Sequence, residues 1–520
     1  MRHRGVVATL IAFVVLLAPE FAWSEPGFSL IQSMPKIVGV SSYYSDAYSS
    51  LSCPSVASCT AVGSGGAYGV PSVITAVDGT WGEPVALPLP SNAGGPGAQP
   101  APTLNSITCS APADCVAVGS YPDKLNDETS YPLVETEVSG TWTASTIALP
   151  SGVTGLTGMS SIWCQGAGSC VTVGSFIEPH QRALPMAAVD TSGTWARAIA
   201  LAVSPTIAPE GLGPFSLACH DVGDCAAIVE ASLSGGGGTG IFQWTEAAGT
   251  WGAAAFLPQL SHSKFEFAGI SAACPSATTC LLVGNLSTVG PTPHPVTVPA
   301  VMTETSGTWS EPHRLALPAL SPVMTQGSLT SLACATSTLC EAVGTLATNS
   351  SDVLSRPGAV TWSNGSWSSL GRIRDVRLGT GLTDWSYLTA VSCGSATTCL
   401  AIGGDVENTA EEYSPAGAFS VDIVPIRQTT LPLPPTSIAV QVVPHGVTVR
   451  WRPPYDDGGA SVTYFTVTIS PGGGHCRTLM AYVCRIAGLV AGHRYRVSVR
   501  DATSVGSSPP TAPIVFTPPR

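Results

Sequence analysis

The residues in this sequence whose types and spacing could do chemistry are, first of all, its sixteen cysteines. Fourteen of them form seven pairs in which five residues separate the two cysteines, and successive pairs begin about every 55 to 60 residues. Close pairs of this kind can bind a metal ion or form a disulfide bond. The pairs are Cys53 with Cys59, Cys109 with Cys115, Cys164 with Cys170, Cys219 with Cys225, Cys274 with Cys280, Cys334 with Cys340, and Cys393 with Cys399.

The spacing of the pairs favours disulfide bonds over metal ions. Zinc sites favour two to four residues between ligands, and two such pairs must converge on one ion. The period of the pairs is typical of repeat architectures, which place each pair in a different repeat. We therefore predict seven disulfides, each contributing about 2 kcal/mol, and an eighth between Cys476 and Cys484. All sixteen cysteines are then paired, and no thiol remains as a nucleophile.

The N-terminus has the pattern of a secretory signal peptide. Arg2 and Arg4 precede an apolar run over residues 5–18, and Ala22 and Ser24 supply the small residues of a cleavage site. The run is too short to span a bilayer comfortably, and no later segment has eighteen uninterrupted apolar residues. We expect residues 1–24 to be removed, with cleavage near Ser24 or Ala22. The mature protein is then secreted and has no transmembrane segment. It is extracellular, and disulfides persist in that environment.

Charge and motif content exclude several classes of function. The formal net charge is −12, charged residues make up 10% of the chain, and lysine occurs three times. Nucleic acids and anionic lipid surfaces bind basic faces, so neither is an expected partner. The sequence also contains no Gly-x-Ser-x-Gly elbow, no His-Glu-x-x-His and no phosphate-binding loop. No motif therefore names a reaction, and the catalytic residues are unknown.

Each cysteine pair belongs to a longer repeat with a fixed order of expected strands. The first strand ends in the first cysteine, as at 105–109, and the second runs from the second cysteine to glycine, as at 115–119. After a variable loop, a third strand leads to a Gly-Thr-Trp turn and a fourth ends in proline, as at 83–88. The turns lie at 79–81, 140–142, 193–195, 249–251 and 307–309, and weaker copies at Gly365-Ser366-Trp367 and Gly417-Ala418-Phe419.

These repeats predict an all-β fold. Short β-rich strands are separated by Gly, Ser and Pro clusters, and helical periodicity is almost absent. Seven units of four strands match a seven-bladed β-propeller over residues 25–428, with one repeat per blade. The tryptophans of the turns recur once per blade, so we interpret them as packing elements between neighbouring blades.

The order of strands and turns resembles the BNR or Asp-box propellers, whose turn reads Ser-x-Asp-x-Gly-x-Thr-Trp. Here the turn is one residue shorter, and an acid precedes its glycine only at Asp78. The resemblance covers residues 25–428 and implies the propeller fold. Sialidases of this class grip the substrate carboxylate with an arginine cluster, whereas the arginines here are scattered.

A propeller closes its ring when one terminus supplies the outer strand of the blade begun by the other. Residues 25–36 belong to a segment that begins with Trp23-Ser-Glu-Pro, which matches Trp309-Ser-Glu-Pro inside a repeat. Residues 420–426 compete for the same place, and the sequence leaves both alternatives open.

The C-terminal segment has a different pattern. A proline-rich linker at 429–435 precedes residues 436–520, which contain no Gly-Thr-Trp turn. This segment resembles a fibronectin type III domain, with Trp451 in the core and Leu489 and Tyr495 at the corner before the sixth strand. The resemblance implies an immunoglobulin-like β-sandwich. No Arg-Gly-Asp tripeptide is present.

Candidate ligand residues lie in the parts that do not repeat. The loops from the second to the third strand, and from the fourth strand to the next blade, emerge on one face of a propeller. The candidates for ligand binding are Tyr43, Tyr44, Tyr48, Tyr121, Asp384, Trp385, Tyr387, Glu178, His180 and Arg182. Calcium is the one cofactor that the acidic loops suggest, through Asp123, Asp127, Glu128, Asp405 and Glu407. Ordinary packing or solvated loop residues are the alternative for each.

Together these patterns predict a secreted, disulfide-stapled binding or scaffold protein of bacterial type, acting as a monomer. The expected partner is a cell-surface glycan or protein, bound by the loop face. The alternative is a secreted glycoside hydrolase, because fibronectin type III modules accompany such enzymes and Asp-box propellers include sialidases. A hydrolase needs two carboxylates about 5 to 10 Å apart. A channel lined by Ser, Thr and Ala would count against it.

Overall fold

The computed structural model describes most of the chain after the N-terminal region. The described residues are 28–35, 48–65, 70–94, 101–124, 129–153, 156–166, 168–178, 182–235, 238–258, 265–288, 297–317, 325–348, 355–368, 370–372, 383–409, 412–423, 432, 434–452, 454, 462–472, 474–479, 481–503 and 506–519. Within them the structure contains β-strands and no α-helix, which confirms the all-β class.

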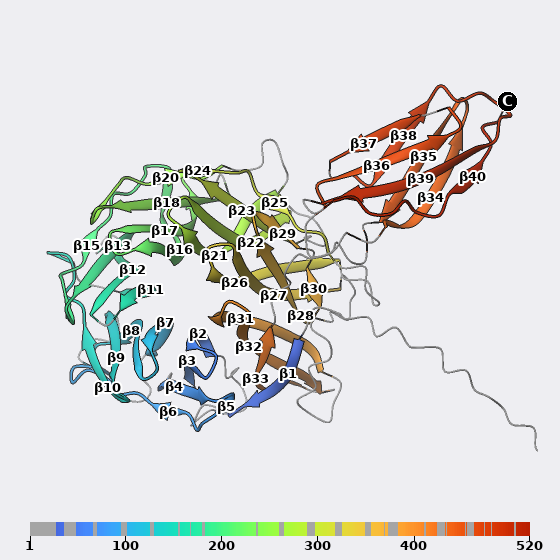
Figure 1. Ribbon diagram of the computed structural model, residues 1–520. Helices are drawn as coiled ribbons and strands as arrows, with labels where there is room; N and C mark the ends of the chain where they lie inside the picture. Colours follow the sequence, from blue (N-terminus) through green and yellow to red (C-terminus); the bar gives the residue numbers. More distant parts are fainter. Residues whose placement is uncertain are drawn as a thin grey trace, which may run out of the picture.

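The described residues from Phe28 to Ile423 form seven similar units of antiparallel strands (Figure 1), and a single parallel pair between Ser355 and Trp385 joins units 6 and 7 into one nine-stranded sheet. Units 1 to 3 comprise β2 (Tyr48–Ser55), β3 (Ser58–Gly65), β4 (Val70–Val77), β5 (Thr80–Trp81) and β6 (Val85–Ala86); β7 (Thr103–Ala111), β8 (Asp114–Pro122), β9 (Ser130–Val138) and β10 (Thr141–Thr146); and β11 (Thr157–Gly166), β12 (Ser169–Ile177), β13 (Ala183–Thr191), β14 (Thr194–Trp195) and β15 (Ile199–Ala200). Units 4 and 5 comprise β16 (Ile207–Asp221), β17 (Asp224–Leu233), β18 (Thr239–Ala247), β19 (Thr250–Trp251) and β20 (Ala255–Phe256); and β21 (Phe265–Ser276), β22 (Thr279–Thr288), β23 (Thr297–Thr305), β24 (Thr308–Trp309) and β25 (His313–Arg314). Units 6 and 7 comprise β26 (Gln326–Thr336), β27 (Leu339–Ala347), β28 (Ser355–Ser363), β29 (Ser366–Trp367) and β30 (Gly371–Arg372); and β31 (Thr383–Ser395), β32 (Thr398–Thr409) and β33 (Glu412–Ile423).

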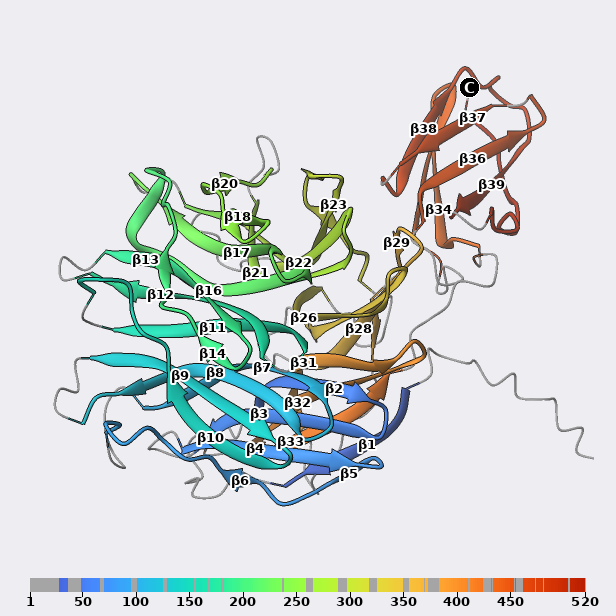
Figure 2. The same ribbon diagram turned by 60° about the vertical axis from the view of Figure 1, so that its left-hand side comes forward.

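The first strands of the units contact one another in chain order and return to the start. β2 contacts β7, and the series continues through β11, β16, β21, β26 and β31, which in turn contacts β2. Figure 1 shows the units around a common centre, and Figure 2 shows the same strands from the side. The first strands are therefore the innermost ones, and the outer strands are short edges.

A serine three residues before the first cysteine links each unit to the next. The Ser50 hydroxyl accepts a hydrogen bond from the Ile107 N–H at 3.1 Å, and Ser106 does the same for Ile162 at 3.3 Å. The corresponding bonds run from Leu217, Ala272, Leu332 and Val391 to Ser161, Ser216, Ser271 and Ser331. Unit 7 has Ala390 at this position, and there Ser392 accepts the Cys53 N–H at 2.9 Å. These bonds join the units through their innermost strands.

The last unit is completed by the N-terminal strand β1 (Phe28–Met34), which pairs antiparallel with β33. Of the two segments left open by the sequence, 25–36 thus contributes the outer strand. Residues 420–423 belong to the third strand instead, since Ser420 lies opposite Ile402 of β32. The expected turn at Gly417-Ala418-Phe419 is wrong for the same reason, because these residues lie inside β33.

The glycine that ends the Ala-Val-Gly pattern is required by a bulge in the neighbouring first strand. In unit 6 the register shifts between Leu329 and Ser331, and a Cβ built on Gly344 would overlap the Ser328 carbonyl oxygen. Gly119, Gly174, Gly284 and Gly403 make the same close approach in units 2, 3, 5 and 7. Unit 4 differs, because Val229 occupies this position and pairs with Phe215.

The cysteines pair as the sequence predicts, and all eight disulfides are present. In the seven units each bond joins the end of the first strand to the start of the second, where the two cysteines face each other. None of the cysteines is free, so the disulfides fix the same corner of every unit. The confirmed bonds are Cys53–Cys59, Cys109–Cys115, Cys164–Cys170, Cys219–Cys225, Cys274–Cys280, Cys334–Cys340, Cys393–Cys399 and Cys476–Cys484.

The tryptophans of the turns pack between adjacent units. The Trp309 Nε1–H donates to Gln243 Oε1 of unit 4 at 2.6 Å, and the ring lies in a core cluster with Ala226 and Ile228. In the same way, the Trp81 Nε1–H donates to Ser420 Oγ of unit 7 at 2.8 Å. The tryptophans are thus structural in these units, as their repetition predicts.

The C-terminal segment forms a separate two-sheet sandwich. One sheet holds β34 (Thr436–Val443), β35 (Gly446–Arg452) and β38 (Val483–Ala487), and the other holds β36 (Tyr464–Ser470), β37 (His475–Thr478), β39 (Tyr495–Ala502) and β40 (Ile514–Phe516). Trp451, Phe465, Leu489 and Tyr495 are buried in its core. The Tyr495 hydroxyl accepts the Val490 N–H at 3.0 Å. Cys476 and Cys484 join edge strands of the two sheets.

Candidate functional site

The seven units present two different faces. The cysteine face carries the disulfides and the short loops between the first and second strands. The loop face carries the connections from second to third strands and from each unit to the next. Away from the cysteines, the strand register departs from the repeat in unit 4 and in unit 7.

The main candidate site is a pair of carboxylates at the seam of units 4 and 5. Glu230 of β17 accepts the Gly269 N–H of β21 at 3.0 Å. In the opposite direction, Glu266 of β21 accepts the Thr239 hydroxyl of β18 at 3.4 Å. Each carboxylate thus contacts the neighbouring unit, and both side chains are half-buried. We call Glu230, Thr239, Glu266 and Gly269 the seam site.

Polar side chains of unit 5 extend the seam site. The position of Gly269 leaves room for the Asn285 side chain, because a Cβ at this glycine would come within 3.0 Å of Asn285 Oδ1. Asn285 Nδ2 donates to Ser287 Oγ at 3.1 Å, and Ser287 Oγ lies 3.2 Å from Thr297 Oγ1. The site therefore offers carboxylate, amide and hydroxyl groups in a row, which can hydrogen-bond ligand hydroxyls.

Local departures from the repeat create this site. With Val229 in place of glycine, β16 does not have the usual bulge. Besides the shift next to Cys219, its register shifts between Ile207 and Leu212 and between Leu212 and Phe215. Gly238 has a φ of +87°, and a side chain there would meet the Glu266 carboxylate. Sequence reasoning missed Glu230 and Glu266. The missing glycine at position 229 was the available signal.

The predicted aromatic group is placed only in part. Tyr43 and Tyr44 lie outside the described residues, as do the side chains of Asp384 and Trp385. Tyr48 is buried, and its hydroxyl donates to the Pro35 carbonyl at 3.0 Å. Thr389, two residues after Tyr387, donates to the Tyr48 carbonyl at 3.1 Å. The two strands are thus neighbours, and Tyr48 has a structural role.

Tyr121 anchors a packed cluster at the loop face of units 1 and 2. Its side chain is fully buried, and its hydroxyl donates to Asn92 Oδ1 at 3.2 Å. Its ring lies 5.7 Å from that of Tyr131, whose hydroxyl donates to Asp123 Oδ2 at 3.3 Å. Burial raises the pKa of Tyr131, and the neighbouring Asp123 carboxylate adds to this. The cluster holds the 88–94 loop in place.

The remaining predicted residues are not brought together in the described structure. Asp127, Glu128 and His180 lie outside it, and so do the side chains of Asp405 and Glu407. The backbone N–H of Glu178 donates to the Arg182 carbonyl at 2.9 Å. Among the described side chains no group of three or more His, Cys, Asp or Glu residues is arranged to bind a metal ion.

A second set of acids that the sequence reasoning missed lies between the units. The third strand of each of units 2 to 5 has an acid at the same position, opposite the tryptophan of the turn. These acids are Glu137, Asp190, Glu246 and Glu304. Burial raises the pKa of each of these carboxyl groups. Their constant spacing of five residues before tryptophan was visible in the sequence.

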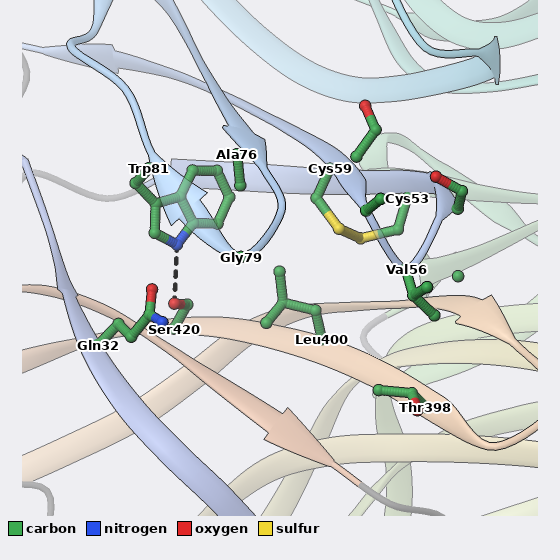
Figure 3. A pocket seen from close by; sticks show the side chains of 14 residues that line it. Gln32, Cys53, Val56, Cys59, Ala76, Gly79, Trp81, Thr398, Leu400 and Ser420 are labelled. Carbon is green, nitrogen blue, oxygen red and sulfur yellow. Dashed lines mark hydrogen bonds between the residues drawn. A yellow bond between two sulfur atoms is a disulfide. The ribbon is translucent and has the colours of Figure 1, made fainter.

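Unit 1 has Ala76 at this position, opposite Trp81. A cavity of about 50 Å³ lies beside it, lined by both cysteines of the Cys53–Cys59 disulfide, Trp81, Leu400 and Ser420. Figure 3 shows it between unit 1 and unit 7, with the hydrogen bond from Trp81 to Ser420. It is a small gap at a structural seam on the cysteine face.

Comparison with known proteins identifies the C-terminal sandwich. The family model described as "Fibronectin type III domain" matches residues 433–517. Residues 433–517 are a fibronectin type III domain. The FN5 domain of Drosophila Lar is a similar solved structure, with 16% identity and a TM-score of 0.16, covering 17% of this chain and 99% of that one.

The remaining comparisons are more distant. A polysaccharide lyase described as a PL25 ulvan lyase bound to its saccharide is 9% identical with a TM-score of 0.45, covering 76% of this chain and 96% of that one. A protein of unknown function from Dyadobacter fermentans is 11% identical with a TM-score of 0.39, covering 60% and 92%. A search of curated proteins gives no match. Over the described ranges, no helix is long and apolar enough to cross a membrane.

Proposed function

We propose that this chain is a secreted binding or scaffold protein that recognises a cell-surface glycan or another surface protein through the loop face. Eight disulfides are typical of an extracellular protein. The fibronectin type III domain is typical of proteins that mediate interactions. In this proposal the signal peptide covers residues 1–24, and the mature protein is a monomer.

The proposed scaffold is a seven-bladed propeller over residues 25–428, followed by a linker at 429–435 and the C-terminal domain at 436–520. The series of contacts from β2 to β31 and back to β2 supports a closed ring. The hydrogen bond from Cys53 to Ser392 and the pairing of β1 with β33 support closure between the last and the first unit.

The single observation that carries the binding proposal is the seam site. The units are most alike at their disulfides and least alike at the loop-face end of unit 4, where Glu230 and Glu266 contact each other's units. Neutral or basic sugars fit this chemistry, because carboxylates accept strong hydrogen bonds from hydroxyl and ammonium groups. Anionic polymers do not fit it, because carboxylates repel them.

A glycoside hydrolase is the second candidate. Such an enzyme requires two carboxylates about 5 to 10 Å apart, and Glu230 and Glu266, which reach across the same seam from adjacent units, are the pair to test. The part of the innermost strands next to the cysteines weighs against it. In all seven units the five residues before the first cysteine contain no carboxylate, and their hydroxyl groups make the bonds between units.

The two candidates separate in one set of assays on the mature protein with its disulfides intact. We expect retention on purified cell-wall polysaccharide or on a glycan array, and loss of retention when Glu230→Gln and Glu266→Gln are combined. A matched control, Glu83→Gln with Glu311→Gln, changes two exposed carboxylates outside the seam site and should bind as the wild type does. Turnover of a glycoside panel that each single seam variant abolishes would establish the hydrolase. Absence of both binding and turnover would contradict both proposals.

A further inference from the structure

Beyond the seam site, the molecule contains acids that are buried between the units, and two of these acids do not belong to the set opposite the turn tryptophans. Glu135 of unit 2 has 0% exposure and Glu341 of unit 6 has 2%. They add to the four acids opposite the turn tryptophans. Neither position follows the repeat, so packing of the strands alone does not demand an acid there.

Glu135 lies between unit 1 and unit 2 in apolar surroundings. It is opposite Ala117 and shares a strand face with Leu133, and both neighbours pack in one cluster with Val62 and Val73 of unit 1. Neither carboxyl oxygen has a hydrogen-bond partner in the described structure. A charged carboxylate is costly in such a place, whereas a protonated one costs much less. Burial accordingly raises the pKa of Glu135 to about 8.

Glu341 lies between unit 6 and unit 7. It is opposite Thr361, whose hydroxyl donates to Glu341 Oε2 at 2.7 Å. Val343 and Ala359, two residues away on the same strand face, pack against Leu388 and other core residues of unit 7. Burial raises the pKa of Glu341 to about 8, although the bond from Thr361 acts in the opposite direction.

Charges that face the buried acids are themselves negative. Asp114 lies close enough to raise the pKa of Glu137, after burial, and Asp224 acts in the same way on Glu246 and on Glu304. Backbone N–H groups act in the opposite direction on Asp190 and on Glu304 by stabilising the charged carboxylate, although burial still raises both pKa values. Burial alone acts on Glu135, and Thr361 faces Glu341. Neutral carboxyl groups are thus the form that this packing favours.

We propose that the ring of units is an acid-stabilised fold, held most firmly when the carboxyl groups buried between its sheets are protonated and loosened as the pH rises from about 5 to about 8. The unfolded chain releases these protons at the ordinary glutamate pKa of 4.5, and the folded chain at about 8 for Glu135 and Glu341. Their contribution to stability is therefore complete below about pH 4.5 and is lost progressively as the pH rises from there to about 8. The low total of 21 Lys and Arg residues limits charge repulsion in acid. The device suits a secreted protein that works in acidic surroundings.

The test is the pH dependence of denaturant-induced unfolding of the mature, disulfide-intact protein from pH 5 to pH 8. We expect the unfolding equilibrium constant of the wild type to rise about a hundred-fold for each of the two groups over this range. The double variant Glu135→Gln with Glu341→Gln keeps the side-chain shape and should reduce this rise about ten-thousand-fold, since the contributions of the two groups multiply. Glu83→Gln, at an exposed acid, should leave it unchanged. A wild type equally stable at pH 5 and pH 8, or a double variant with the full rise, would overturn the proposal.

Infrared spectroscopy of the wild type keeps the proposal testable if the double variant does not fold. At pH 6.5 we expect a carbonyl band of protonated carboxyl groups, which disappears on unfolding at the same pH. A folded protein without this band at pH 6.5 has ionised acids between its sheets and contradicts the proposal.

Discussion

On the cysteine face the seven units are nearly identical, whereas on the loop face units 4 and 5 differ from the others. The same disulfide closes every unit at the cysteine face. At the loop face, Val229 replaces the glycine of the second strand and the seam site appears. The difference shows that residues which recur in all units stabilise the fold. A position that departs from the repeat is not needed for that role and is a candidate for ligand binding.

The largest expected change in stability comes from substituting the glycine of the second strand, and it tests whether unit 4 differs from the other units. Gly344→Ala should destabilise the protein by about 3 kcal/mol, because the added Cβ overlaps the Ser328 carbonyl. Val229→Ala, at the equivalent position of unit 4, only shortens a buried side chain and should cost about 1 to 2 kcal/mol. Denaturant unfolding measures both. Equal losses would show that unit 4 is built like the others.

Removal of a disulfide tests the cysteine face. Cys164→Ala combined with Cys170→Ala should lower the free energy of unfolding by about 2 kcal/mol, because the unfolded chain gains freedom. Cys334→Ala combined with Cys340→Ala should give the same loss within about 1 kcal/mol, since the two bonds occupy equivalent corners. A large difference between the two units in calorimetry would argue against the equivalence.

The indole hydrogen bonds sharpen the comparison within the scaffold. Gln243→Leu leaves Trp309 Nε1 without its acceptor and should cost about 1 to 2 kcal/mol. Trp251 Nε1 of unit 4 has no hydrogen-bond partner in the described structure. The position in unit 3 that corresponds to Gln243 of unit 4 is Ala187, since each lies eight residues before the tryptophan of its own turn. Ala187→Ser should therefore be neutral or stabilise by up to about 1 kcal/mol. Thermal melts of both variants check the pair.

The smallest expected effect on stability belongs to the seam site. Glu230→Gln combined with Glu266→Gln keeps an acceptor oxygen for Gly269 and for Thr239, so the free energy of unfolding should change by less than about 1 kcal/mol. A loss above about 2 kcal/mol in the same unfolding assay would mean that the two acids belong to the scaffold.

The scaffold could be predicted from the sequence because each element has a short, repeated cause. Paired cysteines at constant spacing gave the disulfides, and alternating residues with turn signals gave the strands. The linking serines were also visible, as a serine three residues before the first cysteine in six units. They were missed because their hydroxyl groups bond to another unit, a contact some 55 residues away that local patterns do not encode.

The candidate site could not be predicted in the same way. Tyr121 and Tyr48 were predicted as ligand residues, yet their hydroxyl groups bond to Asn92 and to the Pro35 carbonyl. Aromatic and acidic residues in loops have the same sequence appearance whether they pack or bind. Glu230 and Glu266 form a candidate site only because two strands of different units lie next to each other in the fold.

The central claim is that the loop face at units 4 and 5 binds the partner. The most direct test is hydrogen–deuterium exchange of the mature protein with and without purified cell-wall polysaccharide. We predict protection of β16, β17 and the start of β21, around Glu230 and Glu266, and unchanged exchange in the short loops between paired cysteines. Protection confined to those cysteine loops, or to the fibronectin type III domain, would contradict the claim.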